Sequence, residues 1–244
     1  MLYTLAGAVL LLGLAFAHRS SPLCVGFFFD SRVRSESLRA PGHGVSGWIA
    51  RKLMAIVNAE SNSDVVEALL DVQSGHKVIE LGPGHGFSLR IILRKQPEYV
   101  YAIEVSESFR SLLASDPYFS QAVESRVLTI RGDTGPRYPD IPSASIDRIL
   151  GMNVLTFLNP LRDYVDEVYR VLKPGGFVVW GNKDVAKAGH PHVFVNTDWD
   201  ACAAMMADAG LEVTRTSARL SGKSAYLPLV GRKLRDNDTP RQRQ

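Results

Sequence analysis

A short apolar run that leads into a turn with a glycine at every second position constrains this chain more than any other feature. Residues 78–86 read Val-Ile-Glu-Leu-Gly-Pro-Gly-His-Gly, which predicts a buried strand followed by Gly82, Gly84 and Gly86. An acidic residue, Glu80, stands two positions before the first glycine. Glycine is needed where the backbone takes a positive φ or comes within contact distance of a ligand. The spacing therefore suits a nucleotide-like ligand lying across the carboxyl end of a strand.

The ligand expected from this turn carries no diphosphate. The dinucleotide pattern Gly-x-Gly-x-x-Gly would need its third glycine at position 87, where the chain has Phe87. Phe87 and the helix behind it would fill the gap that the diphosphate of NAD needs. A nicotinamide-dependent oxidoreductase is therefore an alternative that this residue disfavours.

Strand and helix signals alternate from residue 77 onward. Strands are predicted at 77–81, 99–104, 126–131, 146–152 and 176–181. Helices are predicted near 87–95, 106–123, 160–172 and 197–210, and ahead of the first strand near 46–58 and from residue 63. Two further strands, 211–216 and 224–230, are expected to form an antiparallel pair. This order predicts an α/β fold with a doubly wound, mostly parallel seven-stranded sheet and an antiparallel terminal strand.

Acidic residues follow the second and third predicted strands. Glu104 closes the second strand, a place where doubly wound folds use an acid to bind ribose hydroxyls. Asp133 lies in the loop after the third strand, from which it can reach an adenine amino group. Glu80 is expected either to fix the turn or to meet an ammonium group. Together with the glycine turn, these acids suit a ligand with a ribose, an adenine and a zwitterionic tail.

This set of residues resembles the class I S-adenosylmethionine-dependent methyltransferases, in particular the broad small-molecule group often called type 11. Residues 80–86 are similar to the family's motif I, and Glu104 matches its ribose-binding acid. Residues 132–133, 145–150 and 171–176 are similar to the adenine-side loop, the fourth strand and the turn before the fifth strand. The resemblance runs from about residue 77 to residue 230 and implies a Rossmann-like fold.

The resemblance implies S-adenosylmethionine as the cofactor and names the residues that would hold it. These cofactor-binding candidates are Glu80, Gly82, Gly84, Gly86, Glu104, Val105, Asp133, Thr134 and Asn153. His85 is expected to pack near the methionine part rather than to act as a base. Asp147 and the Lys-Pro-Gly-Gly turn at 173–176 are expected to be structural.

The residues that would act in catalysis are less well defined. Asn153, at the end of the fourth strand, is expected nearest the methyl group. It is followed by Val-Leu-Thr and not by Pro-Pro-Tyr, so methylation of nucleic-acid amino groups is disfavoured. His190 and His192 are candidates for a base that faces the acceptor, although a solvent-exposed loop pair is the favoured interpretation. The sequence contains no recognisable metal-binding motif, because Cys24 and Cys202 lie far apart without histidine at ligand spacing.

The first residues of the chain differ in kind from the rest. Residues 1–17 are uncharged and almost wholly apolar, and His18 and Arg19 follow. A retained membrane anchor is favoured, because arginines downstream would keep the following domain in the cytosol, where S-adenosylmethionine is made. A cleaved signal peptide and a mitochondrial presequence are the alternatives. The protein is expected at a membrane, with that of the endoplasmic reticulum favoured. Residues 2–17 would be embedded in it, and the catalytic domain would face the cytosol. Secretion and a mitochondrial location are the alternatives.

Four segments are expected along the chain. Residues 1–19 would be the hydrophobic anchor or signal, 20–73 a linker with leading helices that cap the site, 74–231 the methyltransferase domain, and 232–244 a charged, flexible tail. A net charge of +3 without a clustered basic stripe argues against a nucleic-acid partner. The expected function is that of an enzyme that transfers a methyl group to a small-molecule or lipid acceptor at a membrane surface. A non-catalytic scaffold that binds S-adenosylmethionine is the alternative.

Overall fold

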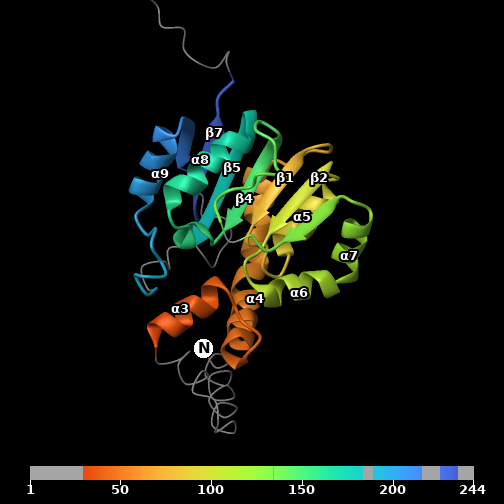
Figure 1. Ribbon diagram of the computed structural model, residues 1–244, viewed down its shortest axis with the longest axis vertical. Coiled ribbons are helices and arrows are strands. Elements are labelled where there is room, and N and C mark those ends of the chain that lie inside the picture. The colour runs from red at the N-terminus through yellow and green to blue at the C-terminus, as the bar shows by residue number, and fades with distance from the viewer. Residues whose placement is uncertain (1–29, 134, 184–188, 216–225, 236–244) are drawn as a thin grey trace, which may run out of the picture.

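Seven strands form the central sheet of the computed structural model, which describes residues 30–133, 135–183, 189–215 and 226–235. In chain order they are β1 (Lys77–Leu81), β2 (Tyr99–Ile103), β3 (Leu128–Arg131), β4 (Ile146–Met152), β5 (Leu172–Lys183), β6 (Leu211–Arg215) and β7 (Tyr226–Lys233). They lie side by side in the order β3-β2-β1-β4-β5-β7-β6 (Figure 1). The first five pair in parallel, and β7 runs antiparallel to both of its neighbours. The predicted fold class is confirmed.

Helices pack on both faces of this sheet and form two apolar cores. One core contains buried residues of α8 and α9, and the other contains residues of α5, α6, α7 and the turn that follows α4. Neighbouring strand residues enter opposite cores, as Val78 and Ile79 do, because side chains alternate across a strand. The helices are α3 (Ser31–Arg39), α4 (Val45–Val65) with a π-helical turn (Val66–Leu70), α5 (Phe87–Arg94), α6 (Glu107–Ser115), α7 (Pro117–Glu124), a 3₁₀ turn (Leu155–Phe157), α8 (Leu161–Val171) and α9 (Trp199–Asp208).

The N-terminal helices differ from those predicted. Helix α3 lies in a stretch expected to be linker and loop, because its residues 31–39 are mostly polar and show little apolar periodicity. Helix α4 is continuous from Val45 to Val65, where the prediction had two helices separated near residue 60. The Ser and Asn residues around that position are weak helix formers, but each costs less than roughly 1 kcal/mol. A helix held at both of its ends can therefore run through them.

Three other boundaries differ from the prediction. The predicted helix 106–123 is two helices, because Pro117 cannot continue α6 and Asp116 accepts a hydrogen bond from the Tyr118 N–H to begin α7. Strand β7 continues to Lys233, so residues 232 and 233 belong to the sheet and not to the expected tail. Strand β5 starts at residue 172, four residues before its predicted start, with an irregularity in its pairing to β4.

Helix α3 and the N-terminal part of α4 lie beyond the carboxyl ends of the central strands (Figure 1), and the C-terminal end of α4 packs on the sheet through Val65. The chain between them is fixed by the Pro41 carbonyl, which accepts hydrogen bonds from Ser106 Oγ at 2.6 Å and Ser108 Oγ at 2.5 Å. Both serines are buried. A further hydrogen bond fixes α3, because Ser35 Oγ accepts from the backbone N–H of His190 at 2.9 Å. These contacts hold the two helices over one edge of the sheet.

The apolar residues 2–17 fall outside the part of the chain that the structure describes. Within the described residues, every helix is too short or too polar to traverse a bilayer.

Candidate active site

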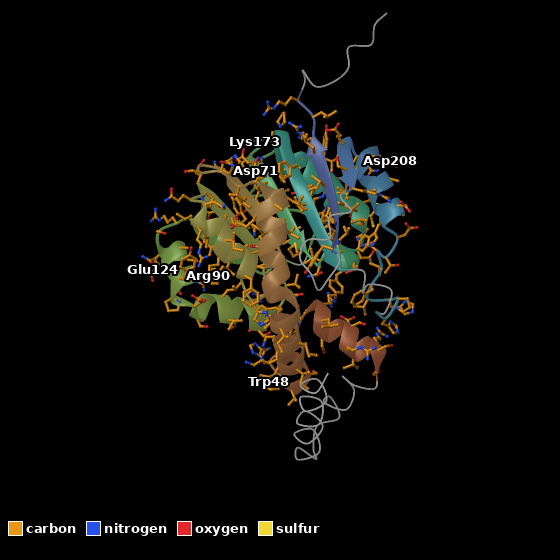
Figure 2. The ribbon with its side chains drawn as sticks, turned by 180° about the vertical axis from the view of Figure 1, so that it is seen from behind. Trp48, Asp71, Arg90, Glu124, Lys173 and Asp208 are labelled. Carbon is orange, nitrogen blue, oxygen red and sulfur yellow. The ribbon has the colours of Figure 1, made fainter. Side chains whose placement is uncertain are left out.

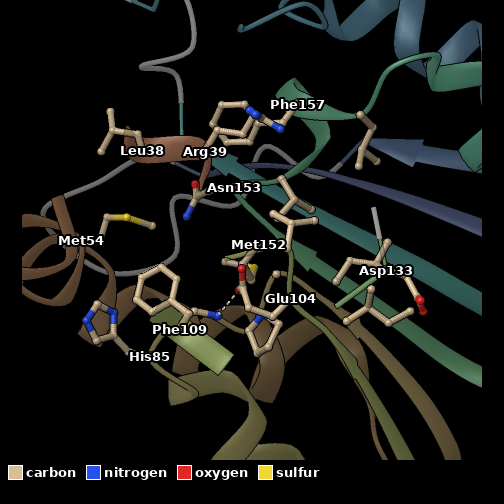
Figure 3. Close-up of a pocket in the computed structure, with 18 of the residues that line it drawn as sticks. Leu38, Arg39, Met54, His85, Glu104, Phe109, Asp133, Met152, Asn153 and Phe157 are labelled. Atoms are coloured by element: carbon tan, nitrogen blue, oxygen red, sulfur yellow. Dashed lines mark hydrogen bonds between the residues drawn. The ribbon is translucent and has the colours of Figure 1, made fainter. Parts of the chain in front are cut away.

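A cavity of about 280 Å³ opens at the carboxyl ends of β1, β2 and β4. Its floor is the glycine turn after β1, and its walls come from α3, α4, the 3₁₀ turn and α8. Six of the predicted cofactor-binding residues line it: Gly82, Gly84, Glu104, Val105, Asp133 and Asn153. Figure 3 shows Glu104 and Asp133 on one side of this cavity and Leu38, Arg39 and Phe157 on the other.

The glycine turn has the backbone form that its sequence predicts. Gly82, Gly84 and Gly86 all have positive φ, at 67°, 55° and 78°. A Cβ on Gly82 would stand 2.4 Å from Val154 Cγ1, so any side chain there would displace the loop after β4. A Cβ on Gly86 would instead overlap the buried ring of Phe119. Gly86 does not line the cavity, and its role is to let α5 and α7 pack closely.

Glu104 is the buried acid at the end of β2, with 4% of its surface exposed. One carboxylate oxygen accepts a hydrogen bond from the Gly84 N–H at 3.0 Å and the other from the Ser106 N–H at 2.8 Å. Burial raises the pKa of Glu104 above its ordinary value, although these two N–H donors act in the opposite direction. The carboxylate is thus fixed between the glycine turn and the first turn of α6. Because Ser106 also binds Pro41, the same network reaches the chain that joins α3 to α4.

The adenine-side loop is partly described. Asp133 lines the cavity and forms an ion pair with Arg131 Nε. Arg131 also pairs with Asp140 at 2.7 Å, which lowers the pKa of Asp140. Val105, exposed to 38%, lines the cavity next to Glu104. Thr134, the neighbouring candidate, lies outside the described residues.

Glu80 does not line the cavity, in contrast to the expectation that it contacts the ligand. It shares its face of β1 with Val78, and that face is covered by α5, where Ser88 Oγ donates to Glu80 Oε1. Its other oxygen, Oε2, is buried without a hydrogen-bond partner. Burial raises the pKa of Glu80 to about 8, and the hydrogen bond from Ser88 offsets part of this rise. Through Ser88, Glu80 therefore links the end of β1 to the start of α5, on either side of the glycine turn.

The raised pKa of Glu80 predicts a pH-dependent stability. The folded-state pKa, about 8, lies above the ordinary 4.5, so its stabilising contribution is complete below about pH 4.5 and is lost as the pH rises through about 8. Glu80→Gln keeps an acceptor for Ser88 and removes this loss. Urea denaturation across this pH range should show the variant gaining stability relative to the wild type as the pH rises. A difference in unfolding free energy that does not change with pH would contradict the assignment.

Asn153 stands where the sequence predicts it, at the end of β4 and in the cavity wall. Its φ is +57°, a left-handed conformation that asparagine tolerates better than most residues. The conformation is fixed by its N–H, which donates to the Gly181 carbonyl at 2.7 Å. Figure 3 shows its side chain between Arg39 and Met152.

His85 also lines the cavity, within an aromatic cluster. Its ring stacks on Phe87 at 5.6 Å and meets the edge of Phe109 at 4.8 Å between centroids. Burial, together with the positive charges of Arg51 and Lys52, lowers the pKa of His85 below its ordinary value. The imidazole is therefore neutral at physiological pH. Phe87, which stands where a dinucleotide site has glycine, lines the cavity beside it.

His190 and His192 are not at the cavity, so the structure does not support them as a base facing the acceptor. Their rings lie 5.3 Å apart in the loop after β5, and neither is among the cavity-lining residues. Backbone contacts fix the described part of this loop, from residue 189 onward. The His190 N–H donates to Ser35 Oγ, and the Val195 N–H donates to the Thr156 carbonyl at 2.9 Å.

One wall of the cavity was not predicted from the sequence. It is formed by α3, α4, the 3₁₀ turn and α8, through Leu38, Arg39, Met54, Asn58, Phe157, Leu158, Asn159 and Tyr164. The sequence predicted only that the helices ahead of β1 cap the site, and it did not indicate which of their residues line the cavity. Burial raises the pKa of Tyr164, and the charge of Arg39, which lines the same cavity, acts in the opposite direction.

The chain is similar to known methyltransferases in sequence and in fold. A family model described as "Methyltransferase domain" matches residues 79–180, from β1 into β5. The family model, the curated relative and the solved structures together support a class I S-adenosylmethionine-dependent methyltransferase. A curated relative of this methyltransferase is the Bacillus subtilis protein "Uncharacterized methyltransferase YdaC", 26% identical over 129 residues that cover 52% of this chain and 67% of the relative.

Solved structures share the methyltransferase fold. A chain from the complex that contains the Haloferax volcanii Trm112 methyltransferase activator has a TM-score of 0.62 at 18% identity, covering 78% of this chain and 97% of that one. Haemonchus contortus phosphoethanolamine N-methyltransferase 2, solved with phosphomonomethylethanolamine and S-adenosylhomocysteine, has a TM-score of 0.60 at 10% identity, covering 77% and 58%. A SAM-dependent methyltransferase from Aquifex aeolicus has a TM-score of 0.56 at 18% identity, covering 83% and 98%.

S-adenosylmethionine is therefore the cofactor of this methyltransferase, and the cavity fits it. The turn at Gly82 and Gly84 leaves backbone open to the cavity, where side chains would obstruct a ligand. A fixed carboxylate, Glu104, and a second acid, Asp133, follow along the same side. These matches favour a methyltransferase over the alternative of a nicotinamide-dependent oxidoreductase. They also favour an enzyme over a non-catalytic scaffold that binds S-adenosylmethionine.

Proposed function

We propose that this methyltransferase moves a methyl group to a lipophilic small molecule or a lipid at a membrane surface. The observation that carries the proposal is the position of α4. One side of this helix lines the cavity through Met54 and Asn58, and the other presents exposed apolar side chains to solvent. An acceptor that leaves a bilayer along α4 would therefore reach the cavity without crossing water.

In this proposal the donor side of the cavity works by positioning. The buried Glu104 carboxylate is placed to accept hydrogen bonds from ribose hydroxyls, and Asp133 lies on the adenine side. Gly82 and Gly84 offer backbone to the methionine part, and Asn153 stands at the border between the donor and acceptor sides. When bound, S-adenosylmethionine supplies a methyl group made electrophilic by the positive sulfur. Residues that orient the two reactants can supply most of the rate enhancement of such a transfer.

The outer side of α4 has the composition of a membrane-facing helix. Val45, Trp48, Leu53 and Ile56 are exposed at 37%, 43%, 39% and 79%, and they recur at helical spacing. Trp48 lies towards the end of α4 that is far from the sheet (Figure 2). The basic residues 51 and 52 adjoin this apolar strip. In this proposal, the exposed apolar and basic residues of α4 rest on the surface of an anionic bilayer.

The apolar residues 2–17 support the same proposal from the sequence. We propose that they are an anchor that holds the methyltransferase domain at the cytosolic face of a membrane. The membrane of the endoplasmic reticulum is the favoured one. The anchor would keep the protein at the bilayer, and α4 would orient the mouth of the cavity towards it. Both contacts serve the delivery of a lipophilic acceptor.

A vesicle assay tests the membrane part of the proposal. The full chain, with methyl-labelled S-adenosylmethionine, is given a lipid extract either in anionic vesicles or dispersed in detergent. Replacing Trp48 and Ile56 by Ser should lower labelling in vesicles about tenfold, because two buried apolar contacts with the bilayer are lost. Labelling in detergent should stay near that of the wild type, since the cavity is intact.

The control for this assay is Val123→Ser on α7, where a residue of similar exposure, 42%, lies on a helix that does not line the cavity. It should leave labelling in vesicles unchanged. Deleting residues 1–19 should release the protein from vesicles in a sedimentation assay. Equal labelling by the Trp48 and Ile56 double variant and the wild type in vesicles would overturn the role of α4, and a shortened chain that still sediments would overturn the anchor.

A further inference from the structure

The acceptor side of the cavity contains one cation and no carboxylate among its described residues. The two acids that line the cavity, Glu104 and Asp133, both lie on the donor side, and each is already held by protein groups. Arg39, in the last turn of α3, is the one Lys or Arg among the described lining residues. Figure 3 shows it across the cavity from the two acids. The cavity therefore has an acidic donor side and a basic acceptor side.

Arg39 can bind a ligand in spite of its existing partner. Its Nε donates to Glu36 Oε2 at 2.8 Å, and the two side chains are exposed to 44% and 43%. An exposed pair of this kind contributes no more than about 1 kcal/mol, so a ligand anion can compete with it or bind the two remaining guanidinium nitrogens. Glu36 itself does not line the cavity.

The surroundings of Arg39 suit an anionic group attached to an apolar body. Tyr164 of α8 lies near it, and burial raises the pKa of this phenol above its ordinary value, so the hydroxyl stays protonated at neutral pH. Leu38, Met54 and Phe157 supply apolar wall on the same side. Phe157 is itself supported by the edge of Phe194, at 4.8 Å between ring centroids. A polar head at Arg39 and an apolar chain along this wall would both be accommodated.

We propose that the acceptor is an amphiphilic carboxylic acid, methylated on its carboxylate oxygen, and that Arg39 determines this specificity. The inference rests on the proposed function and names its substrate class. A carboxylate is ionised at neutral pH and needs no base, which agrees with the position of His190 and His192 away from the cavity. An amine acceptor would arrive as a cation beside Arg39 and would have to lose a proton first. A neutral alcohol would give Arg39 nothing to bind.

The transfer balances without any further reactant. A carboxylate oxygen forms a bond to the methyl carbon while the carbon–sulfur bond breaks and its electron pair stays on sulfur. The products are a methyl ester and S-adenosylhomocysteine. The negative charge of the acid and the positive charge of the sulfonium cancel in this step.

The test uses the full chain loaded with S-adenosylhomocysteine, whose own binding is measured first by calorimetry. Decanoate, decylamine and decanol, which share one chain length, are then titrated into the complex. Decanoate should bind most tightly, and Arg39→Gln should weaken its binding about fivefold, since the ion pair with the carboxylate is lost. With S-adenosylmethionine in place of the product, mass spectrometry should detect methyl decanoate.

Glu36→Gln is the matched control, because it breaks the same ion pair from the other side. It should bind decanoate at least as tightly as the wild type, since a competitor for Arg39 is gone. Tighter binding of decylamine or decanol, equal binding by Arg39→Gln and the wild type, or no binding of decanoate would each overturn the inference. Absence of S-adenosylhomocysteine binding in the first titration would instead overturn the donor site on which the proposed function depends.

Discussion

Gly84→Trp should abolish binding of S-adenosylmethionine and, with it, methyl transfer. Gly84 lines the cavity with φ at +55°, and its N–H donates to Glu104. A Cβ at this position would meet only the ring of Phe109, at 3.8 Å, so the indole would have to extend into the cavity or displace that ring. We expect no measurable heat of binding in calorimetry and no labelled product with a methyl-labelled donor.

Gly75→Trp is the control for this variant. Gly75 also has a positive φ, 81°, and lies in the turn before β1, where a Cβ would meet nothing within 4 Å. Both variants place tryptophan on a left-handed backbone, which costs roughly 1–2 kcal/mol. Only the change at Gly84 should affect the donor. Labelling that survives Gly84→Trp would show that the glycine turn is not the donor site.

Glu104→Ala should weaken donor binding at least a hundredfold. Its carboxylate is the buried acid at the end of β2, and two lost hydrogen bonds to a charged group correspond to roughly 3–6 kcal/mol. The alanine also removes the acceptor that fixes the Gly84 and Ser106 N–H groups. The affinity for S-adenosylhomocysteine, measured by calorimetry, gives the size of the effect.

Two further variants separate the role of Glu104 in binding from its role in the fold. Glu104→Gln keeps the volume and one acceptor oxygen, and should lose less affinity than the alanine variant. Glu107→Ala removes an exposed acid three residues away, in the first turn of α6, and should bind the donor as the wild type does. Thermal denaturation of each variant shows whether the fold is intact. Full affinity in a folded Glu104→Ala variant would contradict the assigned role.

The donor side of the site was predictable because its residues are local in the sequence. The glycine turn comes directly after β1, and Glu104 comes directly after β2. Each signal therefore stands beside a buried strand that the sequence predicts. The carboxyl ends of adjacent parallel strands meet at one edge of the sheet, so these signals converge in space. Glu80 was the exception, because the alternation of side chains along β1 turns it towards Ser88 and away from the ligand.

The acceptor side was not predictable, because it is assembled from distant segments. Arg39 and Tyr164 are brought together only when α3 is held over the sheet by Ser106 and Ser108 through the Pro41 carbonyl. Helix α3 has little apolar periodicity of its own, so its sequence does not indicate a helix or a wall. Another tertiary contact fixes His190, whose backbone N–H binds Ser35 of α3, and His190 is not among the residues that line the cavity.

Calorimetric titration of S-adenosylhomocysteine into the full chain and four variants tests the central claim most directly. The claim is that the glycine turn and Glu104 form the donor site of a methyltransferase. It predicts one-to-one binding to the wild type, Gly75→Trp and Glu107→Ala, and loss of binding in Gly84→Trp and Glu104→Ala. Absence of binding to the wild type, or equal binding by all five proteins, would contradict it.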